Sequence, residues 1–288
     1  MLFRSQKSIL EKKIKHVALF GNPVKHSLSP IIHQYFSKKT GVLYQYTLCL
    51  CTEVNFFLKI SNFFKNGGIG ANITVPFKKK IFALPHIINK YSSISKTVNT
   101  LIKAPNNKII GDNTDGLGLL YDLKNLFLFK KNITVLLLGA GGAATSIIYH
   151  LLIENCLIYI SNRTLIKSQI LIKQFKKFGK IFIFEEHKCS HFFDIIINAT
   201  SSGLYGESPI FPLSLLHHDT FCYDISYNKN GNLTPFLILC KKYGVKNFSD
   251  GVGMLVAQAA YSFFAWFKIM PDIPNTIMFI RSLNKKFF

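Results

Sequence analysis

Val135-Leu136-Leu137-Leu138-Gly139-Ala140-Gly141-Gly142-Ala143-Ala144 is the stretch of the chain that decides the fold. Four apolar residues typical of a buried strand run into a glycine-rich turn, and an apolar helix is expected directly afterwards. This is the G-x-G-x-x-[G/A] pattern in the strand–turn–helix setting of a dinucleotide-binding domain. Gly139 permits the tight turn, Gly141 lets the backbone approach a pyrophosphate, and Ala144 lets helix and strand pack closely. The pyrophosphate would lie on the free N–H groups of the helix N-terminus.

The residues after the next expected strand, 157–160, indicate which dinucleotide would bind. A site for NAD places Asp or Glu there, to bind the ribose hydroxyls. This chain instead has Asn162-Arg163-Thr164, and the Arg163 guanidinium suits a 2′-phosphate. The pattern therefore favours NADP over NAD. The alternative is that Asn162 or Thr164 caps the next helix while Arg163 is only solvated surface.

Further from this motif, short apolar runs alternate with amphipathic segments along most of the chain, which predicts α/β units with parallel strands. A hairpin is expected from 98–103 and 108–112, with a turn between them. The last segment, 252–288, is expected to be helical and to pack onto either half. The expected strands are 16–20, 44–50, 70–74, 135–138, 157–160, 180–184, 194–198 and 220–225, and the expected helices include 53–66, 142–154 and 164–178.

Length and composition limit the class of protein. With 288 residues, the chain has room for about two domains. Hydrophobic residues make up 49% and charged residues 17%, which excludes wholesale disorder. No apolar run reaches the roughly 20 residues that a membrane span needs, and the nearest, 254–267, is interrupted by Gln258. Charges such as Arg4 and Lys7 lie where a signal peptide would be apolar, so a cytoplasmic protein is expected.

The net charge of +21 raises the question of a nucleic-acid or membrane partner. Only three of the 35 basic residues are arginine, and the lysines are scattered, with 78–80 as the longest run. Nucleic-acid surfaces favour the planar fork of arginine. We therefore expect a solvated basic surface, reflecting an AT-rich genome, and neither a nucleic-acid nor a membrane partner.

The cysteines give no sign of a metal centre. They form no CxxC pair and no zinc-site spacing, so no metal is predicted. Buried free thiols are expected, which is consistent with a reducing compartment. The six are Cys49, Cys51, Cys156, Cys189, Cys222 and Cys240.

Two serines follow the first expected strand. Ser29 precedes Pro30, which predicts a helix with Ser29 as the N-cap. Capping does not explain Ser27, and two hydroxyls at a helix N-terminus could hold a substrate carboxylate. His26 and His33 lack metal-site partners and are expected to be structural.

Further polar residues follow in the same half of the chain. Asn72 and Thr74 share one face of the third expected strand. Lys78 is expected in the first turn of the next helix, where a cation opposes the helix dipole, and such a conflict suggests function. The alternative for any lysine in this lysine-rich chain is solvated surface. Asp115 fits a helix N-cap.

Together these segments resemble the shikimate dehydrogenase family over nearly the whole chain. The matching blocks are Gly21-x-Pro23-x-x-His26-Ser27-x-Ser29-Pro30-x-x-His33, Asn72-x-Thr74-x-Pro76-Phe77-Lys78, Val98-Asn99-Thr100, Gly111-Asp112-Asn113-Thr114-Asp115-Gly116, Gly139 to Ala143, Asn162-Arg163-Thr164, Asn198-Ala199-Thr200-Ser201-Ser202-Gly203 and Asp250-Gly251-x-Gly253-Met254-Leu255-x-x-Gln258.

The resemblance implies an α/β fold of two domains with the active site in the cleft between them. Residues 1–114 would form the substrate-binding domain, with the C-terminal helices of 251–288 packing back on it. Residues 115–250 would form a doubly wound Rossmann domain that binds NADP(H). The implied reaction is the reversible NADPH-dependent reduction of 3-dehydroshikimate to shikimate, on the pathway to chorismate and the aromatic amino acids.

The resemblance also implies roles for single residues. Lys78 and Asp115 would be the catalytic pair. Ser27 and Ser29 would bind the substrate carboxylate with Tyr227 nearby, and the ring hydroxyls would be held by Thr74, Asn99, Asp115 and Gln258. The cofactor would be contacted by Gly139, Ala140, Gly141, Gly142, Ala143, Asn162, Arg163, Thr164, Lys167, Ile225 and Gly251.

The chain departs from the family pattern at three places. Lys167 stands where the family often has an Arg that grips the 2′-phosphate, so the charge is kept but the planar fork is lost. Ile225 stands where Met is frequent near the nicotinamide. Lys96-Thr97 precedes Val98 where Gly-Ala is usual.

The same residues admit other functions. The nearest is a quinate/shikimate dehydrogenase of broader substrate and cofactor range. A short-chain dehydrogenase would use a Tyr-x-x-x-Lys pair, but Tyr35 and Lys39 lie upstream of the glycine turn, on the wrong side. A nucleotide-binding protein without activity would lack the Lys/Asp pair, which is present here. Both a monomer and a homodimer fit the sequence.

Overall fold

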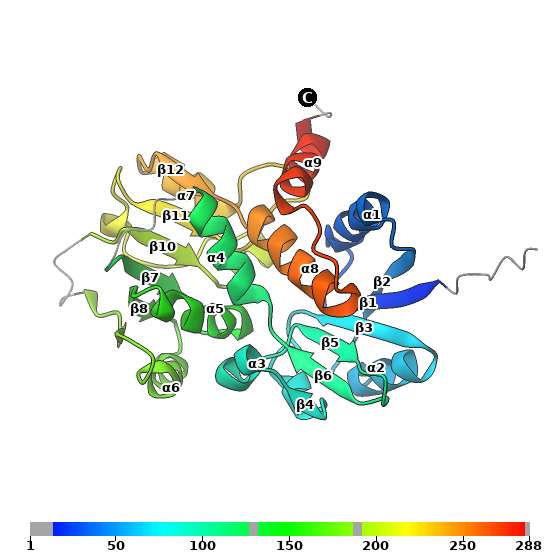
Figure 1. Ribbon diagram of the computed structural model, residues 1–288. Coiled ribbons are helices and arrows are strands. Elements are labelled where there is room, and N and C mark those ends of the chain that lie inside the picture. Colours follow the sequence, from blue (N-terminus) through cyan, green and yellow to red (C-terminus); the bar gives the residue numbers. More distant parts are fainter. Residues whose placement is uncertain (1–13, 127–131, 187–191, 286–288) are drawn as a thin grey trace, which may run out of the picture.

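The computed structural model describes residues 14–126, 132–186 and 192–285. They form two α/β domains, each built on a sheet of six strands (Figure 1). The charged N-terminal segment 1–13 and Cys189 lie outside the described residues. The five cysteines within them are free thiols, as predicted, and four of them are buried. The prediction of burial is wrong for Cys49, which lies on an edge strand of its sheet and is partly exposed.

The second sheet is parallel throughout and has the strand order β12-β11-β10-β7-β8-β9. This is the doubly wound order of a dinucleotide-binding domain, with β7 at its centre. Apolar side chains cover both faces, with helices α4, α5 and α6 on one and α7 on the other. The strands are β7 (Thr134–Leu138), β8 (Leu157–Ser161), β9 (Ile181–Ile183), β10 (Ile195–Asn198), β11 (Phe221–Asp224) and β12 (Asn247–Ser249), and the helices are α4 (Asp115–Leu126), α5 (Gly142–Ile153), α6 (Leu165–Phe175) and α7 (Pro235–Lys242).

The first sheet is mixed and has the order β2-β1-β3-β5-β6-β4. Strands β5 and β6 pair antiparallel and confirm the predicted hairpin. One face packs on α2, and the other on α1 and α8. The strands are β1 (Lys15–Gly21), β2 (Tyr44–Leu50), β3 (Gly68–Ile73), β4 (Ile87–Ile88), β5 (Thr100–Lys103) and β6 (Ile109–Asp112), and the helices are α1 (Ser29–Thr40), α2 (Phe56–Lys65), the 3-10 helix η1 (Lys80–Ala83) and α3 (Lys90–Ser95).

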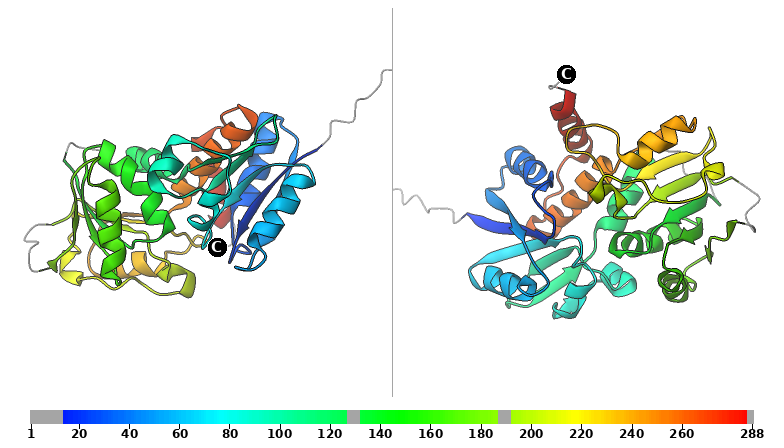
Figure 2. Two further views of the ribbon diagram at one scale, coloured as in Figure 1. Left: turned by 90° about the horizontal axis from the view of Figure 1, so that it is seen from below. Right: turned by 180° about the vertical axis from the view of Figure 1, so that it is seen from behind.

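The C-terminal helices, α8 (Val252–Phe267) and α9 (Ile273–Lys285), return to the first domain. Their apolar faces join α1 in one core cluster, with Phe36 and Phe263 in edge contact. Figure 2 shows from two more sides that α8 lies between the sheets. Helices α4 and α8 pack along each other, so α4 joins the two halves. Among the described helices, none is both long and apolar enough to cross a membrane.

The predicted elements are confirmed apart from local details. The short strands β4 and β12, of two and three residues, were not expected. Three predictions of helix ends are wrong. Ser29 is the first residue of α1 and Leu28 is its N-cap; Lys78 lies in a turn before η1 and not in a helix; and Asp115 is the first residue of α4 rather than its cap.

Candidate functional site

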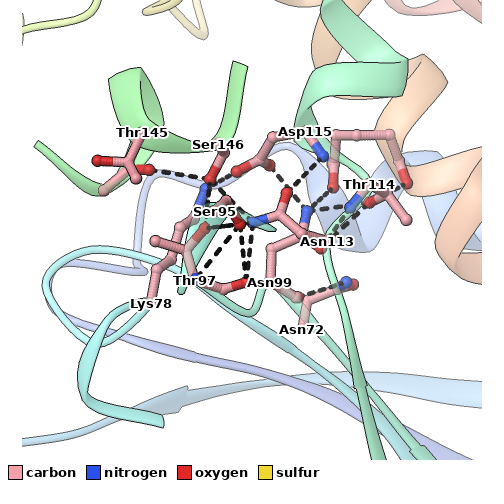
Figure 3. A network of polar contacts seen from close by, with 12 residues as sticks. Asn72, Lys78, Ser95, Thr97, Asn99, Asn113, Thr114, Asp115, Thr145 and Ser146 are labelled. Atoms are coloured by element: carbon pink, nitrogen blue, oxygen red, sulfur yellow. Dashed lines mark hydrogen bonds and ion pairs between the residues drawn. The ribbon is translucent and has the colours of Figure 1, made fainter. Parts of the chain in front are cut away.

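Lys78 and Asp115 meet at the centre of the molecule, although 37 positions separate them in the sequence. Lys78 Nζ lies 2.6 Å from Asp115 Oδ2, and the two side chains are only 14% and 5% exposed (Figure 3). The turn that carries Lys78 is held by its own carbonyl, which accepts a hydrogen bond from Val98 N at 2.9 Å. The structure therefore brings together the two residues expected to form the catalytic pair.

Asn99 fixes the orientation of the Asp115 carboxylate. Its Nδ2 donates to Asp115 Oδ1 at 2.8 Å and to Thr114 Oγ1 at 2.9 Å, and its Oδ1 accepts from Thr114 N at 2.9 Å. Gln258 Oε1, from α8, lies 3.3 Å from the same amide nitrogen. One carboxylate oxygen is thus held by Asn99, and the other faces Lys78.

Asn113 links this site to the second domain. Its Oδ1 accepts from Asp115 N at 3.0 Å, at the start of α4, and its Nδ2 donates at 2.8 Å to both Thr97 Oγ1 and Ser146 Oγ. Ser146 belongs to α5, the helix that follows the glycine turn (Figure 3). No site role was expected for Asn113, since only the folded chain brings α5 beside it.

Ser27, Ser29 and Tyr227 form a second polar group. Ser27 Oγ accepts from Ser29 N at 3.1 Å, and Tyr227 reaches across from the second domain, where its hydroxyl accepts from Leu28 N at 3.3 Å. Burial raises the pKa of Tyr227, while the Leu28 N–H and the Ser27 hydroxyl oppose that rise. The three residues expected near a substrate carboxylate therefore lie together.

Tyr46 connects the two polar groups and was missed from the sequence. Its hydroxyl donates to Asn72 Oδ1 at 2.9 Å, and Asn72 Nδ2 donates to the Asn99 carbonyl at 3.1 Å. Burial raises the pKa of Tyr46, and a hydrogen bond with Ser29 opposes this. The signal available in the sequence was the alternation of Tyr44 and Tyr46 in β2, which places both rings on one face.

The two histidines near the serines differ in their surroundings. His33 is fully buried, stacks on Tyr46 with ring centroids 4.0 Å apart, and shares a 2.9 Å hydrogen bond with the Tyr44 hydroxyl. Burial lowers its pKa to about 3, so the ring is neutral and structural. His26 is exposed.

Thr74 lies directly after β3, on the side of the first domain that carries Lys78. Its backbone N–H donates to the Phe20 carbonyl at 2.9 Å, and its methyl group fills the space where a Cβ on Gly21 would stand. Within the described part of the chain, no residue accepts or donates a hydrogen bond at the Thr74 hydroxyl. That hydroxyl remains able to bind a polar ligand.

The glycine turn has the shape that a pyrophosphate requires. Gly139 has φ +104°, a left-handed conformation that favours glycine. The space in front of Gly141 is open, with nothing within 4 Å of a Cβ placed there, and no side chain caps α5. A Cβ on Gly142 would come 3.5 Å from Lys78 Cβ. The residues therefore fit a dinucleotide, and Lys78 lies beside the turn.

Asn162, Arg163, Thr164 and Lys167 lie at the start of α6, after β8. Asn162 Nδ2 donates to the Thr164 carbonyl at 2.9 Å, and no side chain caps α6. Arg163 and Lys167 are exposed, so both charges are available to a phosphate. Thr164 occupies the N-cap position of α6 and Arg163 is exposed, as the capping alternative expected, but the Thr164 side chain makes no capping hydrogen bond.

Ile225 and Gly251 lie against each other beyond the end of β11, directly before α8. A Cβ on Gly251 would collide with the Ile225 carbonyl, and Gly251 N donates to the Ser226 carbonyl at 3.0 Å. Glycine is therefore required at position 251, because any side chain there would displace the backbone of Ile225.

Comparison with known proteins agrees with this geometry. Three family models match, described as the shikimate dehydrogenase substrate binding domain over residues 19–101, shikimate / quinate 5-dehydrogenase over 124–211, and the shikimate 5′-dehydrogenase C-terminal domain over 251–276. A curated relative, shikimate dehydrogenase (NADP(+)) of Buchnera aphidicola subsp. Cinara cedri, is 56% identical over 95% of this chain and 97% of its own.

Solved structures agree as well. The shikimate dehydrogenase from Aquifex aeolicus has a TM-score of 0.83 at 29% identity, covering 94% of this chain and 99% of its own. The enzyme from Thermus thermophilus in complex with NADP(H) and shikimate has a TM-score of 0.81 at 26% identity, covering 93% and 99%. With a relative this similar over nearly its whole length, the chain belongs to the shikimate dehydrogenase family.

Proposed function

We propose that this chain catalyses the reversible NADP-dependent reduction of 3-dehydroshikimate to shikimate. The observation that carries the proposal is the Lys78–Asp115 pair, 2.6 Å apart, beside the open glycine turn. The curated relative named shikimate dehydrogenase (NADP(+)) and the Thermus thermophilus complex with NADP(H) and shikimate support it.

Lys78 and Asp115 would carry the proton. Reduction of a ketone adds a hydride to carbon and a proton to oxygen, and negative charge develops on that oxygen. The Lys78 ammonium would stabilise this charge and donate the proton. Asp115 would orient Lys78 and accept a hydrogen bond from the hydroxyl. In the oxidation of shikimate the same pair would take the proton back.

The remaining polar residues would hold the substrate in the cleft. Ser27, Ser29 and Tyr227 would bind the carboxylate, because their polar groups converge at the start of α1. The ring hydroxyls would be held by Thr74, Asn99, Asp115 and Gln258. Hydrogen bonds between these residues fix their positions before substrate arrives, which limits reorganisation in the transition state.

NADPH, when bound, supplies the hydride. Its pyrophosphate would lie on the glycine turn, at the uncapped N-terminus of α5. The 2′-phosphate would be held by Asn162, Arg163, Thr164 and Lys167, and Ile225 and Gly251 would flank the nicotinamide. The other residues proposed to contact the cofactor are Gly139, Ala140, Gly141, Gly142 and Ala143.

The domain limits belong to this proposal: 1–114 with 251–288 would bind substrate, and 115–250 would bind NADP. The enzyme would act in the cytoplasm, as a monomer or homodimer, on the pathway to chorismate and the aromatic amino acids. It would need neither nucleic acid nor a membrane, and no metal.

A second candidate is a quinate/shikimate dehydrogenase of broader range. It is favoured by Lys167, which lacks the planar fork of arginine and so grips a 2′-phosphate less specifically. One of the matching family models also covers both substrates by its description.

The test is a spectrophotometric assay of reduced-cofactor formation with shikimate or quinate, each with NADP⁺ or NAD⁺. The proposal expects the highest kcat/KM with shikimate and NADP⁺. Equal rates with quinate or NAD⁺ would favour the broader enzyme. No turnover with any pair, in a sample with the circular dichroism of a folded α/β protein, would contradict both.

A further inference from the structure

Asn113 lies where three segments of the chain meet, and its side chain contacts all of them. The carbonyl oxygen Oδ1 accepts a hydrogen bond from Asp115 N at 3.0 Å, at the start of α4. The amide nitrogen Nδ2 donates at 2.8 Å to Thr97 Oγ1 of the first domain and at 2.8 Å to Ser146 Oγ of the second (Figure 3). Asn113, Thr97 and Ser146 are each at most 2% exposed, so these hydrogen bonds lie in a low-dielectric interior.

The hydroxyl groups beside Asn113 have acceptors of their own. Ser146 donates its hydrogen to the Gly142 carbonyl at 2.9 Å. Thr97 donates its own to Ser95 Oγ at 2.7 Å. Both hydroxyl oxygens are therefore acceptors toward the Asn113 amide, which has two hydrogens, one for each domain. Thr97 Oγ1 and Ser146 Oγ lie 3.0 Å apart, so the two domains are in direct contact at this point.

Toward the first domain, Asn113 contacts the backbone segments that carry Lys78 and Asp115. Its Oδ1 holds the Asp115 N–H at the first residue of α4, the residue whose carboxylate meets Lys78. Val98 directly follows Thr97, and its N–H donates to the Lys78 carbonyl at 2.9 Å. A short path of hydrogen bonds and peptide links therefore joins Asn113 to both members of the pair.

Toward the second domain, the same side chain reaches the glycine turn. Ser146 accepts from Asn113 and donates to the Gly142 carbonyl, at the end of the turn on which the pyrophosphate would lie. Gly142 is also the residue at which an added Cβ would lie 3.5 Å from Lys78 Cβ. The Asn113 side chain thus ties the Lys78–Asp115 pair to the glycine turn across the interface between the domains.

We propose that Asn113 is a positioning residue, which fixes the Lys78–Asp115 pair relative to the glycine turn. This rests on the proposed function, in which the substrate lies at the pair and NADPH lies on the turn. Hydride transfer needs its donor and acceptor carbons aligned near contact distance, and a shift of about 1 Å can lower the rate about 100-fold. The hydrogen bonds of Asn113 are made to the protein, so weakening them slows the transfer more than it weakens the binding of either ligand. Thr97 stands where the family usually has Ala, so its hydroxyl adds a hydrogen bond that the usual residue cannot make.

Single-turnover reduction tests the proposal: the enzyme–NADPH complex is mixed with saturating 3-dehydroshikimate, and NADPH absorbance is followed by stopped flow. Thr97→Val and Ser146→Ala each remove one acceptor of the Asn113 amide, whereas Thr97→Ser keeps the hydroxyl. The matched control is Thr145→Val, one position from Ser146 on α5. The Thr145 hydroxyl is also buried and donates to the Gly141 carbonyl at 2.8 Å, four residues earlier, as the Ser146 hydroxyl does to its own partner.

Thr97→Val and Ser146→Ala are each expected to lower the first-order rate constant of hydride transfer about five- to tenfold. The Kd for NADPH and the KM for 3-dehydroshikimate are expected to change less than about twofold. Thr97→Ser and Thr145→Val are expected to keep all three values within about twofold of the native chain. A first-order rate constant does not depend on the fraction of folded enzyme, so partial unfolding cannot produce the expected loss.

Three results would overturn the assignment: native-like rate constants in both Thr97→Val and Ser146→Ala, the same fall in Thr145→Val, or a loss of NADPH affinity as large as the loss of rate. A fall in Thr97→Ser that matches Thr97→Val would also overturn it, because packing and not the hydroxyl would then be responsible. If the native chain does not oxidise NADPH with this substrate, the proposed function and this inference are both contradicted. Native activity that the variants fully retain contradicts the inference alone.

Discussion

We predict that His150 makes the folded protein sensitive to mild acid, and the size of the expected effect follows from the surroundings of the ring. The ring lies on α5 and is only 2% exposed. It packs where a Cβ on Gly116 would stand and against Tyr91, with ring centroids 4.6 Å apart. Among the residues that the structure describes, neither ring nitrogen has a hydrogen-bond partner of good geometry. Such a site accepts the neutral imidazole and excludes the charged one.

Burial lowers the pKa of His150 to about 4; Lys90 also lowers it, whereas the Ser146 carbonyl and Asp115 oppose the shift. The unfolded chain binds this proton near the ordinary pKa of 6.5. The stability due to a neutral His150 is therefore complete above pH 6.5 and is lost as the pH falls toward 4. From pH 7 to pH 5, the titration of His150 lowers the ratio of folded to unfolded protein by a factor of about 20, which corresponds to a loss of about 2 kcal/mol in the free energy of unfolding.

Other buried groups also change the free energy of unfolding with pH, some raising it and some lowering it. The pH dependence of the native chain's stability alone therefore does not isolate the effect of His150. The pKa of His33 is lowered to about 3 by burial, and its contribution is lost over the same range. The pKa values of Asp122 and Asp224 are raised to about 6 by burial. These two carboxyls take up protons in the folded state, so each adds about 1 kcal/mol of stability between pH 7 and pH 5.

Urea unfolding followed by circular dichroism, at pH 7 and pH 5, measures the difference. The variant His150→Leu removes the titrating ring, and His16→Gln is the control at an exposed position. The native protein and the control are expected to lose about 2 kcal/mol more than His150→Leu between the two pH values. If His150→Leu and the native chain change by the same amount, the burial argument is refuted.

Three further substitutions test other contacts. Gly116→Ala is expected to lower the free energy of unfolding by about 2 kcal/mol in urea, because the new methyl group collides with His150. The double variant with His150→Ala should regain most of this stability, and an equal loss in both backgrounds would contradict the collision. Asn99→Ala is expected to lower kcat about 10- to 100-fold in the dehydrogenase assay, since a charge-assisted hydrogen bond to the Asp115 carboxylate is lost. A change in kcat below about twofold would show that this hydrogen bond is dispensable. Tyr223→Phe removes the 2.6 Å hydrogen bond to the buried Asp122 carboxylate. The free energy of unfolding is expected to fall by about 1–3 kcal/mol at pH 8 but by less at pH 5, because the pKa of Asp122 is raised to about 6 and the carboxyl is protonated at pH 5. Equal losses of stability at both pH values would argue against an ionised Asp122 at pH 8.

Periodic patterns in the sequence predicted most of the fold. The run from Val135 to Leu138 is the central strand of the parallel sheet, and the strands around it follow the expected α/β alternation. Helix ends were predicted less well, because Ser29 and Asp115 satisfy the preferences of a cap and of a first-turn residue equally. Strands β4 and β12, which were not expected, depend on pairing with neighbours and not on local preference.

The site was predicted where a motif marked it and missed where only packing creates it. Lys78 and Asp115 each lie in a recognisable block, and the structure places them in contact. Tyr46, by contrast, lies in an ordinary strand, and its role arises because its hydroxyl reaches Asn72.

The most direct measurement for the central claim is the kcat of Lys78→Met for shikimate oxidation with NADP⁺, compared with the native chain. Methionine keeps most of the stem beside Gly142 and removes the charge that pairs with Asp115. We predict that kcat falls about 1,000-fold, while KM for shikimate and the Kd for NADP⁺ change less than about threefold. A kcat within about tenfold of the native value would contradict the assignment of Lys78 as the proton donor.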